Sequence, residues 1–205
     1  MENETDYILE NVTKLFKKFG IKSVSMDDIA GELGISKKTL YTHFNDKEEL
    51  VKKIIYLEFS KKKCLLESFS NINNNAIEEA LEVYKMVNGY IKEITPTVEY
   101  DLKKYYPQIH KELSAFRTAN IQLSVTSNLI KGVSEGLYRN DFDVEIIAKL
   151  HIARVDYMLS EEFFTGNEKN SKKAFNELFI YHLRGICSEK GLKFLEEKLD
   201  ILKKQ

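Results

Sequence analysis

Apolar residues recur at intervals of three and four along most of this chain, the spacing that places them on one face of an α-helix. The first such stripe consists of Ile8, Val12, Leu15, Phe16 and Phe19. Gly20 follows it and can end the helix in a left-handed cap. Similar patterns continue through the rest of the sequence, which contains only two prolines. The pattern predicts an all-α fold.

Two short helices are predicted directly after this first one. Ser25 followed by Asp28 has the spacing of a capping box, which indicates a helix over 26–33. Gly34 breaks that helix, and Ser36 is a suitable N-cap for a third helix over 37–44. Two helices that meet across a three-residue turn form a helix-turn-helix.

The third predicted helix has one apolar face and one polar face. Leu40 and Phe44 are four residues apart and can both face a core. The other positions carry hydrogen-bond donors and positive charge, namely Lys37, Lys38, Thr39, Tyr41, Thr42 and His43. A helix-turn-helix places such a face in the major groove of DNA. The alternative is an ordinary solvated helix face.

The charge of the chain helps to decide between a DNA-binding face and a solvated one. The whole chain has a net charge of −1 and a predicted pI near 6.5. Such a chain does not coat nucleic acid indiscriminately, so any contact with DNA must come from a local patch. Residues 13–53 contain nine lysines and six acidic residues, a local excess of three positive charges. The helix-turn-helix therefore coincides with a basic part of an otherwise acidic chain.

The segment IAGELGISKKTLYTHFNDKEEL, residues 29–50, closely resembles the helix-turn-helix of the TetR family of bacterial transcriptional regulators. The resemblance implies that Lys37, Lys38 and Tyr41 face the bases. It also implies contacts with the phosphate backbone from Thr39, Thr42, His43 and Lys47. Among the DNA-binding residues, Ser25 matches the family's hydroxyl residue at the start of the second helix. Two positions depart from the family pattern: Lys38 stands where glycine is common, and Asp27 stands where some relatives carry a cation.

A long helix over 47–69 is predicted to join the reading head, residues 1–46, to a second domain, residues 47–205. Asn45 is the predicted N-cap of this helix, with Glu48 at its third position. Further helices are predicted over 76–94, 97–105, 109–135, 144–164, 171–187 and 192–204. The resemblance implies that this second domain binds an effector and forms a homodimer.

The segments 144–164 and 171–187 each carry apolar residues on more than one face. Two apolar faces require two burial partners, so one face is predicted to pack against a second copy of the chain. A two-fold pair would also place two reading heads about 34 to 36 Å apart, one turn of DNA. The alternative is that both faces are buried within one monomer.

A small-molecule pocket is predicted from aromatic and polar residues in the middle of the chain. Aromatic walls with a few polar groups suit an apolar effector. The candidate residues are Tyr90, Tyr106, His110, Phe116, Arg117 and Tyr157. The alternative role for the rings is ordinary core packing.

Other classes of function lack support in the sequence. No glycine-rich phosphate loop, nucleophile motif or cluster of metal ligands is found, so we expect no catalytic residues, no metal and no cofactor. Cys64 and Cys187 are read as reduced thiols, and the absence of a long apolar run or leader predicts a cytoplasmic protein.

The sequence thus predicts a DNA-binding transcriptional repressor that a small-molecule effector releases from a palindromic operator. The alternative is a DNA-bound interaction protein of the same fold without an effector.

Overall fold

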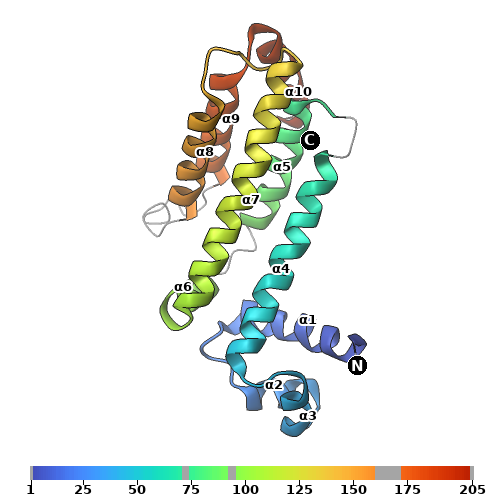
Figure 1. The fold of residues 1–205 in the computed structure, drawn as a ribbon. Coiled ribbons are helices and arrows are strands. Elements are labelled where there is room, and N and C mark those ends of the chain that lie inside the picture. Colours follow the sequence, from blue (N-terminus) through green and yellow to red (C-terminus); the bar gives the residue numbers. More distant parts are fainter. Residues whose placement is uncertain (1, 71–73, 92–95, 160–171, 204–205) are drawn as a thin grey trace. The chain divides into compact units, whose positions relative to one another are not determined.

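The computed structural model describes residues 2–70, 74–91, 96–159 and 172–203. These residues form ten helices, and a single isolated bridge between Tyr138 and Cys187 is the only β-type pairing among them. The helices are α1 Glu2–Phe19, α2 Met26–Leu33, α3 Lys37–His43, α4 Lys47–Ser70, α5 Ala76–Ile91, α6 Pro96–Tyr105, α7 Pro107–Ser134, α8 Val144–Leu159, α9 Lys172–Ile186 and α10 Glu189–Lys203 (Figure 1). The predicted all-α fold is confirmed.

Each predicted helix has a counterpart, with differences at the ends. The first helix begins at Glu2, before the apolar stripe starts, and the last begins at Glu189 instead of Leu192. The predicted ends over 92–94 and 160–164, and the predicted ends at Ser171 and Lys204, lie outside the described residues.

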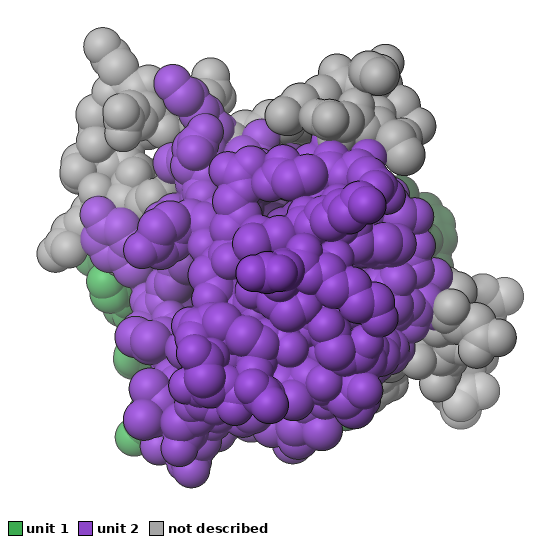
Figure 2. Space-filling view, turned by 90° about the horizontal axis from the view of Figure 1, so that it is seen from above, with its two compact units in different colours: residues 1–64, 94–117 green, residues 65–93, 118–205 purple. Residues whose placement is uncertain are grey.

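The chain divides into two compact units (Figure 2). Unit 1 consists of residues 1–64 and 94–117, and unit 2 consists of residues 65–93 and 118–205. This division differs from the domain boundary predicted after residue 46. Leu102 of α6 and Ile109 of α7 belong to the same hydrophobic core as the N-terminal helices, so later parts of the chain complete unit 1.

The core of unit 1 is formed by the inner faces of α1 to α4 together with α6 and α7. Its central side chains, including Val12, Ile29, Leu40 and Leu50, are fully buried. The predicted α1 stripe is correct for Ile8, Val12 and Phe16 and wrong for Phe19, which is 50% exposed. Phe19 is the last residue of α1, and Gly20 turns the chain away with a φ of 84°.

Local hydrogen bonds explain where the short helices begin and end. Ser25 and Asp28 form a complete capping box at α2, and Gly34 ends that helix in the left-handed region with a φ of 65°. The Ser36 side chain caps α3 by accepting from the Thr39 N–H. The predicted cap of α4 was wrong by one residue, because Asp46 Oδ1 accepts from the Glu49 N–H at 2.8 Å.

Unit 2 has a separate core, built from α5, α7, α8, α9 and α10. Ile77, Leu129 and Leu195 are fully buried at its centre. The buried Tyr138 hydroxyl donates to the Ala76 carbonyl at 3.2 Å and to Asn128 Oδ1 at 3.0 Å, and burial raises the pKa of this phenol. These bonds attach the start of α5 to the turn after α7.

Candidate DNA-binding site

The α3 helix presents the two faces that its sequence predicts. Leu40 and the capping residue Phe44 are buried in the core of unit 1. Lys38, Tyr41 and Thr42 lie on the opposite side and are exposed, Tyr41 to 43%. Because no acidic residue lies within α3, this outer face carries hydroxyl groups and positive charge.

Lys37 is also exposed, but its charge is already paired. Its Nζ lies 2.8 Å from Asp27 Oδ1 at the start of α2, and this hydrogen-bonded ion pair raises the pKa of Lys37. Asp27 is the acid that departs from the family pattern. A base contact by Lys37 therefore competes with Asp27 for the ammonium.

The predicted hydroxyl contacts have hydrogen-bond partners within the chain. Ser25 Oγ donates to Asp28 Oδ2 at 2.6 Å and accepts from the Asp28 N–H at 3.1 Å. Thr42 Oγ1 donates to the Thr39 carbonyl at 2.6 Å, and Thr39 Oγ1 lies 2.8 Å from Ser36 Oγ. Ser25 and Ser36 cap the starts of α2 and α3. The Ser25 and Thr42 hydroxyls already donate their single protons within the chain, so phosphate contacts from them would require these protons to reorient and stay predictions.

His43 differs from its neighbours because its ring turns toward α1. The side chain is only 10% exposed, and its Nδ1 lies 2.9 Å from Thr5 Oγ1. Its Nε2 lies 3.6 Å from a Glu4 carboxylate oxygen. In this conformation His43 holds α1 against α3, and a phosphate contact from the ring stays a prediction.

Lys47 folds back onto the protein at the start of α4. Its Nζ donates to the Ile21 carbonyl at 2.6 Å, so the ammonium fastens the connection between α1 and α2. Burial, and then the charge of Lys22, lower the pKa of Lys47, while Asp101 and Asp28 oppose that shift.

Asp101 on α6 is a contributor to this region that the sequence did not reveal. It is only 4% exposed, and its Oδ2 accepts the Lys22 N–H at 2.7 Å. Gly20 lies against the same helix, because an added Cβ there would come within 2.9 Å of Thr97 and 3.0 Å of Asp101. The connection that precedes the helix-turn-helix is thus held by α6, across 79 residues of sequence.

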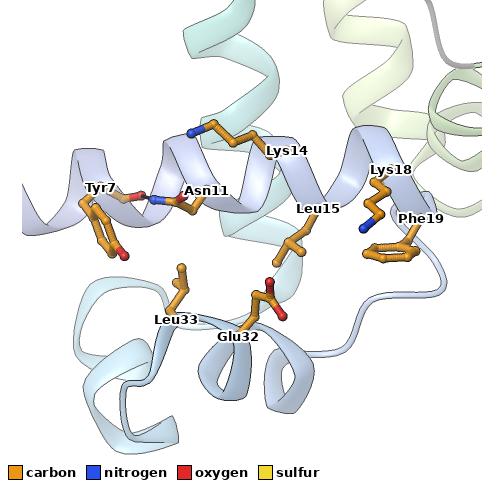
Figure 3. Close-up of a pocket in the computed structure, with 8 residues that line it drawn as sticks. All are labelled: Tyr7, Asn11, Lys14, Leu15, Lys18, Phe19, Glu32 and Leu33. Carbon is orange, nitrogen blue, oxygen red and sulfur yellow. Dashed lines mark hydrogen bonds between the residues drawn. The ribbon is translucent and has the colours of Figure 1, made fainter.

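A groove of about 320 Å³ lies between α1 and α2 (Figure 3). Tyr7 and Phe19 stand at its two ends in the view, with Leu15 and Leu33 between them. Asn11, Lys14, Lys18 and Glu32 complete its lining. Phe19 thus belongs to an outer apolar stripe of α1 that the sequence analysis did not separate from the inner one.

The six residues predicted to line an effector pocket are distributed over both units. Tyr106, His110, Phe116 and Arg117 belong to unit 1, and Tyr90 and Tyr157 belong to unit 2. His110 Nε2 lies 3.0 Å from Glu99, and the Phe116 ring packs against Tyr56 and Phe59. Tyr157 is 53% exposed, and the Tyr90 side chain lies outside what the structure describes. The shared pocket stays a prediction.

The α8 helix has the second apolar face that the dimer prediction requires. Its inner residue Ala148 is buried in the core of unit 2. Ile146, Leu150 and Tyr157 are each more than half exposed, at spacings of four and seven residues along one outer stripe. On α9, which lies beside α8 in Figure 1, Tyr181 is 81% exposed.

The described residues offer neither a membrane span nor a metal site. None of the helices there combines the length and apolar content needed to cross a membrane. That part of the chain also contains no group of three or more His, Cys, Asp or Glu side chains able to hold a metal ion.

Comparisons with known proteins agree with this architecture. The family model described as "Bacterial regulatory proteins, tetR family" matches residues 8–54, which span α1 to the start of α4. The biofilm operon icaADBC HTH-type negative transcriptional regulator IcaR of Staphylococcus aureus is 26% identical over 202 residues, 90% of this chain and 99% of that protein. A TetR-family regulator structure from Agrobacterium tumefaciens has a TM-score of 0.71 at 18% identity and covers 91% of this chain and 99% of that one.

A further relative carries the name of an enzyme. The 4-hydroxy-tetrahydrodipicolinate reductase of Clostridium tetani is 28% identical over 149 residues, 64% of this chain. The chain spans only about half of that relative, 53% of its length. IcaR is instead matched over nearly its whole length and is named a negative transcriptional regulator, and the family model matched over residues 8–54 describes bacterial regulatory proteins. The helix-turn-helix, the family match over residues 8–54 and the similarity to IcaR over nearly its whole length support a DNA-binding transcriptional regulator of the TetR type.

Proposed function

We propose that the chain acts in the cytoplasm as a homodimeric repressor that binds a palindromic operator through α3 and is released by a small-molecule effector. The observation that carries the DNA contact is the outer face of α3, where Lys38, Tyr41 and Thr42 are exposed and no acid is present. We propose repression and not activation because the chain is similar to IcaR, a negative regulator.

The dimer is supported by the apolar stripe on α8. Single exposed apolar residues are ordinary, but a contiguous row of large ones marks an interaction surface. Ile146, Leu150 and Tyr157 form such a row, and a two-fold partner would cover it with the same surface. The pair would present two α3 helices to successive major grooves about 34 to 36 Å apart.

Release by an effector requires a connection from unit 2 to the reading head. The α7 helix supplies a covalent one, because its first part belongs to unit 1 and its remainder to unit 2. The α6 helix, which precedes it, holds the α1–α2 connection through Asp101. We propose that displacement of α7 by an effector reaches the reading head through this contact.

The DNA-binding face is tested by two substitutions with a matched control. Tyr41→Ala removes a base-facing ring and should weaken binding to a selected operator by about 5- to 150-fold, the range of about 1 to 3 kcal/mol expected for one specific base contact. Lys38→Ala removes a second base-facing side chain together with its positive charge, and it should also weaken binding.

The control is Lys85→Ala, which removes an exposed lysine from α5. Fluorescence anisotropy of a labelled operator measures all three affinities, and sedimentation checks that each variant has the oligomeric state of the wild type. Wild-type affinity in both Tyr41→Ala and Lys38→Ala would show that α3 does not read the DNA.

A further inference from the structure

Asn88 on α5 contains a polar atom without a hydrogen-bond partner. Its Oδ1 is buried, and no donor in the described part of the chain reaches it. The other end of the same amide is occupied, since Nδ2 donates to Asn176 Oδ1 on α9 at 3.4 Å. Buried acceptors are normally satisfied, so this oxygen marks a place where a donor from outside the chain can bind.

Asn176, the amide that Asn88 contacts, also binds Tyr84, whose ring packs on two phenyl rings. The Tyr84 hydroxyl donates to Asn176 Oδ1 at 2.5 Å. The Tyr84 ring stacks on Phe175 with 5.4 Å between centroids and an interplanar angle of 4°, and it lies 4.7 Å from Phe179. These five residues, all in unit 2, form what we term the α5–α9 amide cluster.

The chemistry of the cluster restricts what it can bind. Its five side chains are two amides, one phenol and two phenyl rings, so they provide no charge to balance an ionic ligand. Burial raises the pKa of the Tyr84 phenol, which keeps this group neutral near pH 7. An unpaired charge would be strongly disfavoured there, whereas flat apolar rings pack well against stacked aromatic side chains.

We propose that the α5–α9 amide cluster binds a neutral effector with a flat aromatic body and a hydroxyl or N–H group that donates to Asn88 Oδ1. This inference rests on the proposed function, because it assigns a site and a ligand class to the effector. The residues differ from those expected from the sequence, which did not single out Asn88 or Asn176.

The position of the cluster also indicates how binding is communicated. Helices α5 and α9 pack against each other, and Asn88, Tyr84 and Asn176 bridge them. A ligand that reaches Asn88 must part the two helices or rotate one of them. Because α9 runs beside the proposed dimer surface of α8, binding there shifts the equilibrium between two dimer arrangements and hence the spacing of the reading heads.

The test uses two probes that differ in a single hydrogen-bond donor. 2-Naphthol carries a hydroxyl that can donate to Asn88, whereas the oxygen of 2-methoxynaphthalene can only accept. The protein contains no tryptophan, so naphthol fluorescence is measured without indole emission. The wild-type dimer should bind 2-naphthol about fivefold more tightly, the ratio that one net hydrogen bond of about 1 kcal/mol supplies.

Two variants test whether Asn88 causes the difference in affinity between the two probes. Asn88→Leu removes the acceptor and should reduce the affinity ratio of the two probes to about one. Asn140→Leu, at an exposed position between α7 and α8, is the matched control and should keep the wild-type ratio. Circular dichroism checks that each variant is folded. If Asn88→Leu does not fold, the comparison of the two probes in the wild type still decides the question.

Equal affinities of the wild type for both probes, tighter binding of 2-methoxynaphthalene, or no saturable binding of either would overturn the proposal. An unchanged ratio in Asn88→Leu would also overturn it. All of these measurements are made without DNA. Failure here together with normal operator binding would therefore refute the effector site alone and leave the DNA-binding function standing.

Discussion

Replacement of Asp101 should weaken both the stability of unit 1 and its hold on DNA. The carboxylate is buried and accepts the Lys22 N–H at 2.7 Å, while the neighbouring Ile21 carbonyl holds Lys47. In Asp101→Leu the Lys22 N–H loses its acceptor. Loss of a hydrogen bond to a charged group costs about 1.5 to 3 kcal/mol.

The size of the effect can be graded with a second substitution. Asp101→Asn keeps an oxygen that can accept from Lys22 and loses only the contribution of the charge, about 1 kcal/mol. For a chain of this length each kcal/mol lowers the melting temperature by about 2 to 4 °C. The melting temperature should therefore fall by about 3 to 12 °C in Asp101→Leu and by about 2 to 4 °C in Asp101→Asn.

Operator affinity is the second readout and is measured well below the melting temperature. The α1–α2 connection leads directly into α2, so its displacement should weaken binding about fivefold or more, the lower end of couplings between distant sites. Asp6→Asn on the exposed side of α1 is the control. Unchanged melting and unchanged affinity in Asp101→Leu would refute the role assigned to α6.

Three further results are expected. Asp27→Asn frees Lys37 from its ion pair and removes a negative charge beside α3, so DNA affinity should rise, most at low salt; an unchanged affinity in anisotropy titrations would count against the base contact predicted for Lys37. Gly31→Ala should stabilise the chain to urea by about 1 kcal/mol, because an added Cβ meets no atom within 4 Å; a lower urea midpoint would contradict this. Burial, and then the charge of Arg154, lower the pKa of His182 to about 4 and the pKa of His151 well below 6.5. As the pH drops from 6.5 toward 4, the unfolded chain binds protons at these residues before the folded chain does, so the free energy of unfolding should fall. In calorimetry, His182→Gln should make this loss of stability with falling pH smaller.

Local sequence signals located the helices and the polar face of α3 because those features depend on neighbouring residues. Ser25 with Asp28, Gly34 and Ser36 fix the ends of α2 and α3 through hydrogen bonds that span three or four residues. The inward orientation of His43 could also have been predicted, because His43 lies three residues after the buried Leu40 and therefore near the inner face of α3.

Contacts across long sequence distances could not be predicted in this way. The bond from Lys22 to Asp101 joins residues 79 apart, and the bond from Tyr84 to Asn176 joins residues 92 apart. No periodicity in either segment indicates its partner. For the same reason Phe116, which packs on Tyr56 and Phe59 within unit 1, was assigned to a pocket on its residue type alone.

The exposed stripe on α8 is a feature that the sequence indicates only in part and the structure completes. Its sequence shows only that apolar residues occupy more than one face of the helix. The structure adds that Ala148 is buried in the core of unit 2 while Leu150 remains more than half exposed. A face that the monomer leaves uncovered is what a homodimer requires, and the concentration dependence of sedimentation provides a direct check.

The central claim is that α3 reads a specific DNA sequence as part of a two-fold pair. The most direct measurement is selection from a randomised duplex library at physiological salt, with wild-type protein and Tyr41→Ala in parallel. The account predicts that the wild type enriches one palindrome whose half-sites lie about 34 to 36 Å apart, and that Tyr41→Ala does not. Retention of duplexes with no shared sequence, or enrichment of the same palindrome by Tyr41→Ala, would contradict it.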